Sequence, residues 1–173
     1  MTNFKENLAR VKAFVFDIDG VLSLQTISLN AFGVPNRTIN LRDGYAVQLA
    51  VKKGYHVAVI SGSNAKEYQK RLKQLGVKDV YLNSRSKLEH FNEFLRKHDL
   101  NISDVLFMGD DIPDHEVMKV AGVPVCPSDA DSEIRQVAGY ISDKRGGEGC
   151  VRDVIEQVLR LHNKWMEPDG FSW

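Results

Sequence analysis

Two aspartates one residue apart, Asp17 and Asp19, follow the apolar run KAFVF at positions 12–16. Acidic side chains at the end of a buried strand are costly unless a partner compensates their charge. A divalent cation is a natural partner, because Mg²⁺ binds through a few oxygens and keeps some of its water. Side chains alternate along an extended chain, so the two acids point different ways and can do different work. The pair alone fits turn or capping aspartates equally well.

A second acidic cluster, Asp110, Asp111 and Asp114, follows the apolar run VLFM at 105–108. The carboxyl ends of parallel strands share one edge of a sheet, and ligands of open α/β sheets bind there. One of these acids can therefore complete a metal site begun at Asp17. The alternative is that Asp111 or Asp114 caps the helix that follows, but capping does not account for both clusters at once.

Two further polar residues occupy similar places. The run HVAVI at 56–60 leads into Ser61, where a hydroxyl and backbone N–H groups at a helix start can form a phosphate cradle. Lys87 lies near the start of the helix expected at 86–98 and can supply a positive charge. Taken alone, a capping serine and a solvated lysine are the simpler interpretation.

Short apolar runs alternate along the chain with stretches of helical period. Runs that are apolar at nearly every position are typical of strands covered on both faces, as in a parallel sheet. We expect strands at 12–16, 56–60, 79–82, 105–108, 123–126 and 140–141, and helices at 44–53, 64–75, 86–98, 113–121, 131–138 and 148–163. The alternation predicts a doubly wound, Rossmann-like α/β domain with helices on both faces of the sheet. Asp43 is expected to cap the first helix.

Residues 23–41 break this alternation. Two alternating polar and apolar runs surround Gly33, Pro35 and Asn36, and this pattern predicts a β-hairpin inserted after the first strand. The tail at 164–173 holds both tryptophans and is too short to fold alone. Because no linker or repeat appears, we expect one domain over 1–173.

The composition is that of an ordinary soluble chain. Its 173 residues are enough to bury a core. The 23 basic and 23 acidic residues balance, so no broad field favours nucleic acid. A polar N-terminus and the lack of a run of about 20 apolar residues give no sign of a leader or a membrane span. Cys126 and Cys150 do not form a disulfide framework, which favours the cytoplasm.

The order of the four motifs resembles that of the haloacid dehalogenase superfamily, and specifically its phosphatases. Those enzymes carry an acid pair, a Ser or Thr, a Lys and an acid cluster, each after a strand, and the likeness here covers about 12–114. The resemblance implies that Asp17 attacks phosphorus to give an aspartyl-phosphate. Asp19 would act as the general acid and then the general base. Ser61 and Lys87 would bind the phosphate oxygens.

The same resemblance implies a magnesium cofactor. Its ligands would be the Asp17 carboxylate, the backbone carbonyl of Asp19 and the Asp110 carboxylate. Asp111 and Asp114 would orient the site rather than ligate the metal. The acid at Asp19 favours phosphoryl transfer, since the dehalogenases of the superfamily lack it.

Phosphatases of this superfamily commonly carry a cap domain, whereas this chain has room only for the hairpin at 23–41. The N-L-R-D-G-Y segment at 40–45 and the G-G-E-G loop at 146–149 resemble those of the cap-less 3-deoxy-D-manno-octulosonate 8-phosphate phosphatases. That likeness runs from about 11 to 161. It implies a homotetramer in which hairpins pack together and a C-terminal tail reaches a neighbour's site. It also implies a sugar-acid phosphate substrate, contacted by Asp19, Asn40, Leu41, Arg42, Asp43, Gly44, Arg71 and Lys87.

Three departures from that pattern keep other substrates and roles open. Ser63, Gln48 and Glu148 stand where the octulosonate enzymes commonly carry arginines. One alternative is a phosphatase for 2-keto-3-deoxynononate 9-phosphate or N-acylneuraminate 9-phosphate. A second is a non-catalytic oligomerisation module of the same fold, and a third is a phosphomutase or phosphotransferase.

Overall fold

A six-stranded parallel sheet forms the centre of the computed structural model, which describes residues 4–172. The strands are β1 (Ala13–Phe16), β2 (His56–Ile60), β3 (Asp79–Tyr81), β4 (Val105–Met108), β5 (Val123–Cys126) and β6 (Tyr140–Ile141). Their order in the sheet is β3-β2-β1-β4-β5-β6. The chain runs outward in both directions from β1, so the gap beyond the ends of β1 and β4 is the switch point where such sheets bind ligands.

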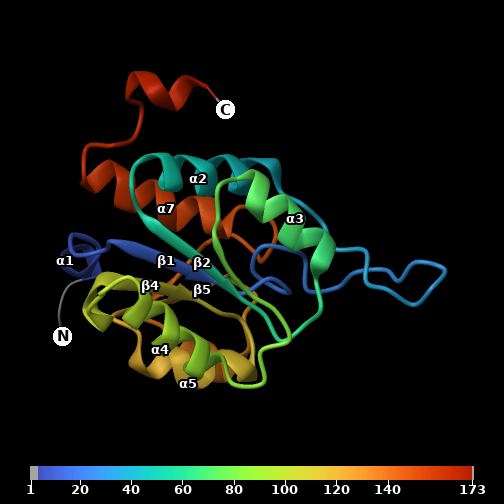
Figure 1. Cartoon of the computed structure of the whole chain (residues 1–173). Helices are drawn as coiled ribbons and strands as arrows, with labels where there is room; N and C mark the ends of the chain where they lie inside the picture. The colour runs from blue at the N-terminus through green and yellow to red at the C-terminus, as the bar shows by residue number, and fades with distance from the viewer. Residues whose placement is uncertain (1–3, 173) are drawn as a thin grey trace.

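Helices cover both faces of this sheet, as the alternation predicted. They are α1 (Phe4–Leu8), α2 (Leu41–Lys52), α3 (Lys66–Gln74), α4 (Lys87–Lys97), α5 (His115–Val120), α6 (Ser132–Val137) and α7 (Cys150–Leu161), with 3₁₀ turns at Ile102–Asp104, Ile112–Asp114 and Pro168–Phe171. Helices α2 and α7 lie side by side on one face, and α4 and α5 lie on the other (Figure 1).

The two faces are built by alternate residues of the strands. Phe14 and Phe16 of β1 belong to the core under α2 and α7, whereas Ala13 and Val15 belong to the core with α4 and α5. All four are fully buried. Continuous apolar runs are what such two-sided burial requires, so the doubly wound α/β prediction is confirmed.

The start of α2 differs from the prediction. The helix begins at Leu41, and the Asn40 side chain caps it by accepting the backbone N–H groups of Arg42 and Asp43 at 2.9 and 3.2 Å. The prediction that Asp43 caps this helix was therefore wrong. Asp43 lies in the first turn, and its carboxylate is buried.

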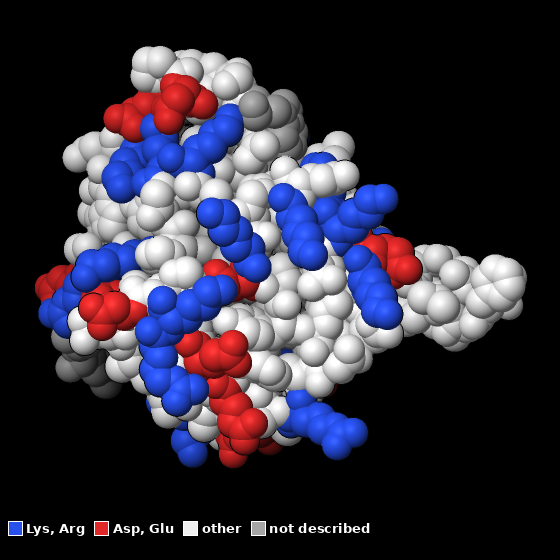
Figure 2. All heavy atoms as spheres, in the orientation of Figure 1, with Lys and Arg blue, Asp and Glu red and all other residues white. Residues whose placement is uncertain are grey.

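The inserted segment at 23–41 reverses direction but forms no strand. Its two arms meet at one antiparallel bridge between Leu29 and Pro35, and the N–H of Asn30 donates to the carbonyl of Val34 at 2.9 Å. The predicted hairpin-like insertion is present, but its arms form a single antiparallel bridge and no regular strands, because an isolated two-stranded ribbon has little to stabilise its ladder. We call residues 24–38 the flap. It extends away from the domain in Figure 1, and between 24 and 36 it carries no charged residue, as its white surface in Figure 2 shows.

The C-terminal tail lies against α2 of the same chain. The Tyr45 hydroxyl donates to the carbonyl of Gly170, and Lys53 pairs with Glu167 and Asp169. Expectations for Trp173 lie outside the described residues. Of the helices within 4–172, none has the length and apolar character to cross a membrane.

Candidate active site

The site forms at the carboxyl ends of β1, β2 and β4. Asp17 directly follows β1, and its backbone N–H donates to the carbonyl of Met108 at the end of β4, at 3.1 Å. The Asp17 side chain faces a cavity of about 300 Å³. The cavity is lined by Asp17, Asp19, Gln25, Ser61, Gly62, Ser63, Lys87, Asp110, Asp111, Pro113 and Asp114. The four motifs found in the sequence therefore meet at one place.

Lys87 is the buried cation of this cavity. It is the first residue of α4, which Ser86 caps by accepting the N–H of Glu89. Its Nζ lies 3.0 Å from Oδ1 of Asp17 and donates to Oδ1 of Asp114 at 2.7 Å. Although burial lowers the pKa of Lys87, the charges of Asp17 and Asp114 raise it above the ordinary value. Lys87 is therefore a buried, charged group directed at Asp17, not a solvated lysine.

Asp114 supports the site from beneath. Its Oδ2 accepts the backbone N–H of Asp110 at 3.2 Å and that of Asp111 at 3.5 Å. Asp111 in turn accepts the N–H of Ile112 at 2.8 Å, so the two acids form a reciprocal capping box. Asp114 therefore takes part in the helix cap and also in the site. One of its oxygens binds Lys87, and the other holds the Asp110 loop.

Gly20 lets the first acidic loop approach the second. Its φ is +88°, and a Cβ at this position would overlap Oδ2 of Asp110. Only glycine adopts such a conformation readily while leaving room for a carboxylate. The spacing Asp17-x-Asp19-Gly20 is therefore required by the contact with Asp110 as well as by the turn.

Three buried carboxylates converge where a cation can bind. Oxygens of Asp17, Asp110 and Asp114 lie within 4.8 Å of one another. Oδ1 of Asp17 and Oδ1 of Asp110 are buried and accept no hydrogen bond among the described residues, although Oδ1 of Asp17 is ion-paired with Lys87. Since Asp114 uses both its oxygens on Lys87 and the loop, the carboxylates of Asp17 and Asp110 are the ones suited to a cation. A hard divalent cation such as Mg²⁺ matches this all-oxygen donor set.

The pKa shifts of Asp17 and Asp110 also indicate that the negative charge of these carboxylates is not fully compensated. Burial, followed by the charge of Asp114, raises the pKa of Asp17 well above its usual value. The same two causes raise the pKa of Asp110 to about 7. A carboxylate whose pKa is raised in this way loses free energy when it ionises, and a bound cation would restore it.

Asp19 differs from the other acids because its side chain reaches the rim of the cavity. It is 37% exposed and is held by Arg37 through two hydrogen bonds of 2.8 and 2.9 Å. Ser61, by contrast, is buried after β2, and its Oγ lies 2.8 Å from Oγ of Ser63. The hydroxyls and Lys87 therefore face the cavity together with the acids.

Comparison with known proteins agrees with this arrangement. Residues 79–154 match the model of the haloacid dehalogenase-like hydrolase family. The chain is 32% identical over 171 residues to 3-deoxy-D-manno-octulosonate 8-phosphate phosphatase KdsC of Salmonella typhi, which covers 99% of this chain and 91% of the relative. The chain belongs to the KdsC family of haloacid dehalogenase-like hydrolases. It is therefore an enzyme of the phosphoric monoester hydrolase class, as the resemblance implied.

Two further members of the family support the assignment. KdsC of Escherichia coli K12 is 33% identical over 162 residues, which is 94% of this chain and 86% of the relative. A crystal structure of the Moraxella catarrhalis phosphatase, in complex with magnesium ion, phosphate ion and KDO, superposes with a TM-score of 0.90 at 29% identity. It covers 99% of this chain and 97% of that chain. The KdsC-like fold and the resemblance stated from the motifs are thereby confirmed.

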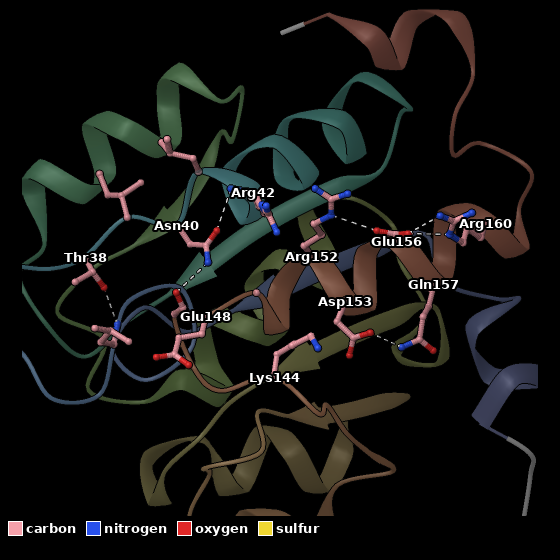
Figure 3. Close-up of a pocket in the computed structure, with 15 residues that line it drawn as sticks. Thr38, Asn40, Arg42, Lys144, Glu148, Arg152, Asp153, Glu156, Gln157 and Arg160 are labelled. Carbon is pink, nitrogen blue, oxygen red and sulfur yellow. Dashed lines mark hydrogen bonds and ion pairs between the residues drawn. The ribbon is translucent and has the colours of Figure 1, made fainter.

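Of the residues expected to contact the substrate, Asp19 and Lys87 line this cavity, whereas the others lie beside it. Asn40, Leu41 and Arg42 line a larger groove of about 1170 Å³ that runs along α7 (Figure 3). Asn40 joins its two sides, because its Nδ2 donates to the carbonyl of Gly147 at 3.1 Å. Four cations and three acids line this groove: Arg42, Lys144, Arg152, Arg160, Glu148, Asp153 and Glu156. Glu156 pairs with both Arg152 and Arg160. The groove therefore suits a polar ligand.

Asp43, Gly44 and Arg71 occupy a third place. They line a small, nearly filled pocket between α2 and α3. Burial raises the pKa of Asp43 to about 6, against the opposing effect of the backbone N–H of Arg152. The structure does not bring the Asp43 carboxylate to the Asp17 cavity, so a substrate contact through that side chain stays a prediction.

Sequence reasoning missed two residues of the cavity rim, Arg37 and Gln25. Gln25 donates to Oδ2 of Asp110 at 3.3 Å from the outgoing arm of the flap, and Arg37 holds Asp19 from the returning arm. One signal was available for Arg37, since it is the sole charged residue between Asp19 and Arg42. Because the flap is inserted directly after β1, its returning arm, which carries Arg37, comes back to the edge of the sheet where Asp19 lies.

Proposed function

We propose that this protein is a Mg²⁺-dependent phosphatase that hydrolyses 3-deoxy-D-manno-octulosonate 8-phosphate to the free sugar acid and phosphate. The observation that carries the proposal is the convergence of the buried carboxylates of Asp17 and Asp110, with the Lys87 ammonium 3.0 Å from Oδ1 of Asp17 and with Oδ1 of Asp110 accepting no hydrogen bond among the described residues. A metal and a phosphate dianion would satisfy those groups. The names of the family members supply the substrate.

The first half of the reaction uses Asp17 as the nucleophile. Its carboxylate oxygen attacks phosphorus, the bond to the sugar oxygen breaks, and an aspartyl-phosphate forms. Lys87, Ser61 and the backbone N–H groups after Ser61 hold the phosphate oxygens as charge moves. Asp17, Asp110 and the carbonyl of Asp19 would hold Mg²⁺. When bound, the ion offsets the repulsion between two anions.

Asp19 serves both halves from the rim. It gives a proton to the leaving sugar oxygen, and it then takes a proton from the water that hydrolyses the aspartyl-phosphate. Its position two residues beyond Asp17, with a partly exposed side chain, supports this role because the leaving group faces the open side of the cavity. Asp111 and Asp114 keep the Asp110 loop in place.

The sugar acid would extend from the cavity toward the α7 groove. Arg42, at the start of α2, suits the carboxylate of an octulosonate, since a guanidinium binds a carboxylate through two hydrogen bonds. The complete set of acids with Lys87 is what a hydrolase needs and what a non-catalytic module of this fold would not require. Relatives named for octulosonate rather than nononate support the former sugar.

We also infer that one domain spans the chain and that it works as a cytoplasmic homotetramer. The flap offers an uncharged surface for self-association, with Phe32 91% and Leu29 62% exposed. Apolar side chains exposed on a projecting loop favour contact with another copy of the chain. Sedimentation velocity on the full chain, compared with a Phe32→Ser variant, would test this assembly.

The test of the function is a hydrolysis assay with octulosonate 8-phosphate, nononate 9-phosphate and a hexose phosphate side by side. Phosphate release with Mg²⁺ should be fastest for the octulosonate and should be lost on EDTA treatment. Asp17→Asn should abolish it, whereas Asp143→Asn at an exposed surface pair should not. The proposal fails if the wild-type protein with Mg²⁺ releases no phosphate from any of them.

A further inference from the structure

The flap, not the sheet, holds the Asp19 carboxylate. Arg37 donates from Nε to Oδ1 at 2.8 Å and from Nη2 to Oδ2 at 2.9 Å. A guanidinium fork of this kind fixes both the position and the plane of a carboxylate. We propose that Arg37 is a positioning residue that sets the orientation in which Asp19 meets the leaving-group oxygen. The inference rests on the proposed phosphatase function, in which Asp19 is acid and base.

Asp19 needs such a partner more than the other acids do. Asp17, Asp110 and Asp114 are buried and closely packed, whereas the Asp19 side chain is 37% exposed. Within residues 4–172, no side chain apart from Arg37 donates a hydrogen bond to its carboxylate. An exposed aspartate samples several rotamers unless a partner selects one. A group that must reach a substrate oxygen within hydrogen-bond distance gains rate from that selection.

Arg37 is itself anchored beside the catalytic loop. The N–H of Thr38 donates to Oγ of Ser23 at 2.9 Å, and the N–H of Leu24 donates to Oγ1 of Thr38 at 2.9 Å. The two arms of the flap are thus joined four residues after Asp19. These two hydrogen bonds fix the returning arm of the flap, so Arg37 is held in place next to Asp19.

The dependence is reciprocal. The Arg37 side chain is only 10% exposed, and a largely covered cation is costly without a partner. Removing Asp19 would leave Arg37 unpaired, just as removing Arg37 would free Asp19. Effects of changing both residues should therefore not add.

The test is a double-mutant cycle of Arg37→Met and Asp19→Asn, measured on an alkyl phosphate with Mg²⁺ in the steady state. Arg37→Met should lower kcat roughly 10- to 100-fold, a part of the ~10²–10⁴ that acid–base catalysis contributes, and should leave KM within about threefold. Arg37→Lys keeps the charge without the fork and should recover only part of the loss. In the Asp19→Asn background, Arg37→Met should change kcat less than about twofold. The exposed Arg96→Met is the control and should match wild type.

A crystal structure of Arg37→Met gives a readout besides activity. The Asp19 carboxylate should leave its position while Asp17 and Asp110 keep theirs. The proposal is overturned if Asp19 keeps its orientation, if Arg37→Met raises KM alone, or if the loss is equally large without the Asp19 acid. Should Arg37→Met not fold, Arg37→Lys carries the same comparison. If the wild type cleaves no phosphate ester, the proposed function fails, and the crystal comparison alone decides the role of Arg37.

Discussion

The carboxylate of Asp43 accepts the backbone N–H of Arg152 at 2.7 Å, across 109 positions of sequence. Helix α7 has Gly149 as its N-cap, with no side-chain cap of its own, so an acid in the first turn of α2 serves its first turn instead. The N-terminus of a helix favours a negative group. This contact joins the two helices that cover one face of the sheet, near the groove that we assign to the sugar acid.

Asp43 should make stability depend on pH in a defined window. Burial raises its pKa from 3.8 to about 6 in the folded protein. The folded state therefore binds a proton more tightly than the unfolded state, and the free energy of unfolding falls as pH rises from about 4 to about 6. The loss should be on the order of 3 kcal/mol and should persist above that window.

Urea unfolding at pH 4.5, 5.5 and 7, for wild type and Asp43→Asn, measures this contribution. The asparagine keeps an oxygen for the N–H of Arg152 but does not titrate. Subtracting the two curves removes the pH dependence of all other acids. Parallel curves over the whole range would show that Asp43 does not carry the shift.

Removing one buried charge from the cavity should stabilise the metal-free protein. Burial raises the pKa of Asp110 to about 7, so its ionised form costs free energy at pH 8. Asp110→Asn should raise the free energy of unfolding there by on the order of 4 kcal/mol in EDTA. Wild type should gain ~2.7 kcal/mol from Mg²⁺ at 100 times its Kd, and the variant should gain almost nothing.

Thermal melts with and without Mg²⁺ separate these two effects. Asp143→Asn is the matched control, because Asp143 is an exposed aspartate that pairs with Lys144 and is not among the residues lining the cavity. It should respond to Mg²⁺ as wild type does. An Asp110→Asn protein that still gains stability from Mg²⁺ would remove Asp110 from the metal site.

The sheet could be read from the sequence because its strands are buried on both faces. Strands β2, β4, β5 and β6 have the predicted bounds, since each is a short run followed directly by serine, glycine or proline. The four motifs could also be placed together from the sequence, because each follows a strand and the carboxyl ends of parallel strands lie at one edge of the sheet. Prediction failed where contacts between distant segments decide the local structure. The helix expected from 113 to 121 is split into a 3₁₀ turn and α5, because Asp114 turns inward to Lys87 and the Asp110 loop.

The flap is the second region whose structure could not be predicted from the sequence. Alternation within 23–41 predicted a β-hairpin, but the segment has no sheet beside it, and its arms share one β-bridge and a few hydrogen bonds in place of a regular ladder. The pairing of Arg37 with Asp19 depends on the path of those arms, which periodicity does not describe. A single charged residue in an uncharged segment was the available signal.

Lys87 should be needed for folding as well as for turnover. It pairs with two buried acids, Asp17 and Asp114, so Lys87→Met leaves both uncompensated. The expected loss is about 3–5 kcal/mol of unfolding free energy, with no measurable phosphatase activity. Lys87→Met with Asp114→Asn removes one of the stranded charges and should recover part of the stability but none of the activity. Urea unfolding and phosphate release decide; a double variant no more stable than the single one would contradict the pairing.

Gly20 should be required by the space beside it and not by its backbone angle alone. Gly20 and Gly54 have nearly the same φ, +88° and +84°, but a Cβ at Gly54 meets nothing within 4 Å. Gly54→Ala should therefore cost only the left-handed conformation, about 1–2 kcal/mol, and leave activity intact. Gly20→Ala pays the same cost and also drives its methyl group into the carboxylate of Asp110. It should be the less stable variant and should weaken the stabilisation by Mg²⁺ at least tenfold in apparent Kd. Melting curves over a Mg²⁺ titration compare the two alanines directly, and equal Mg²⁺ responses would show that the Asp110 carboxylate moves aside without consequence.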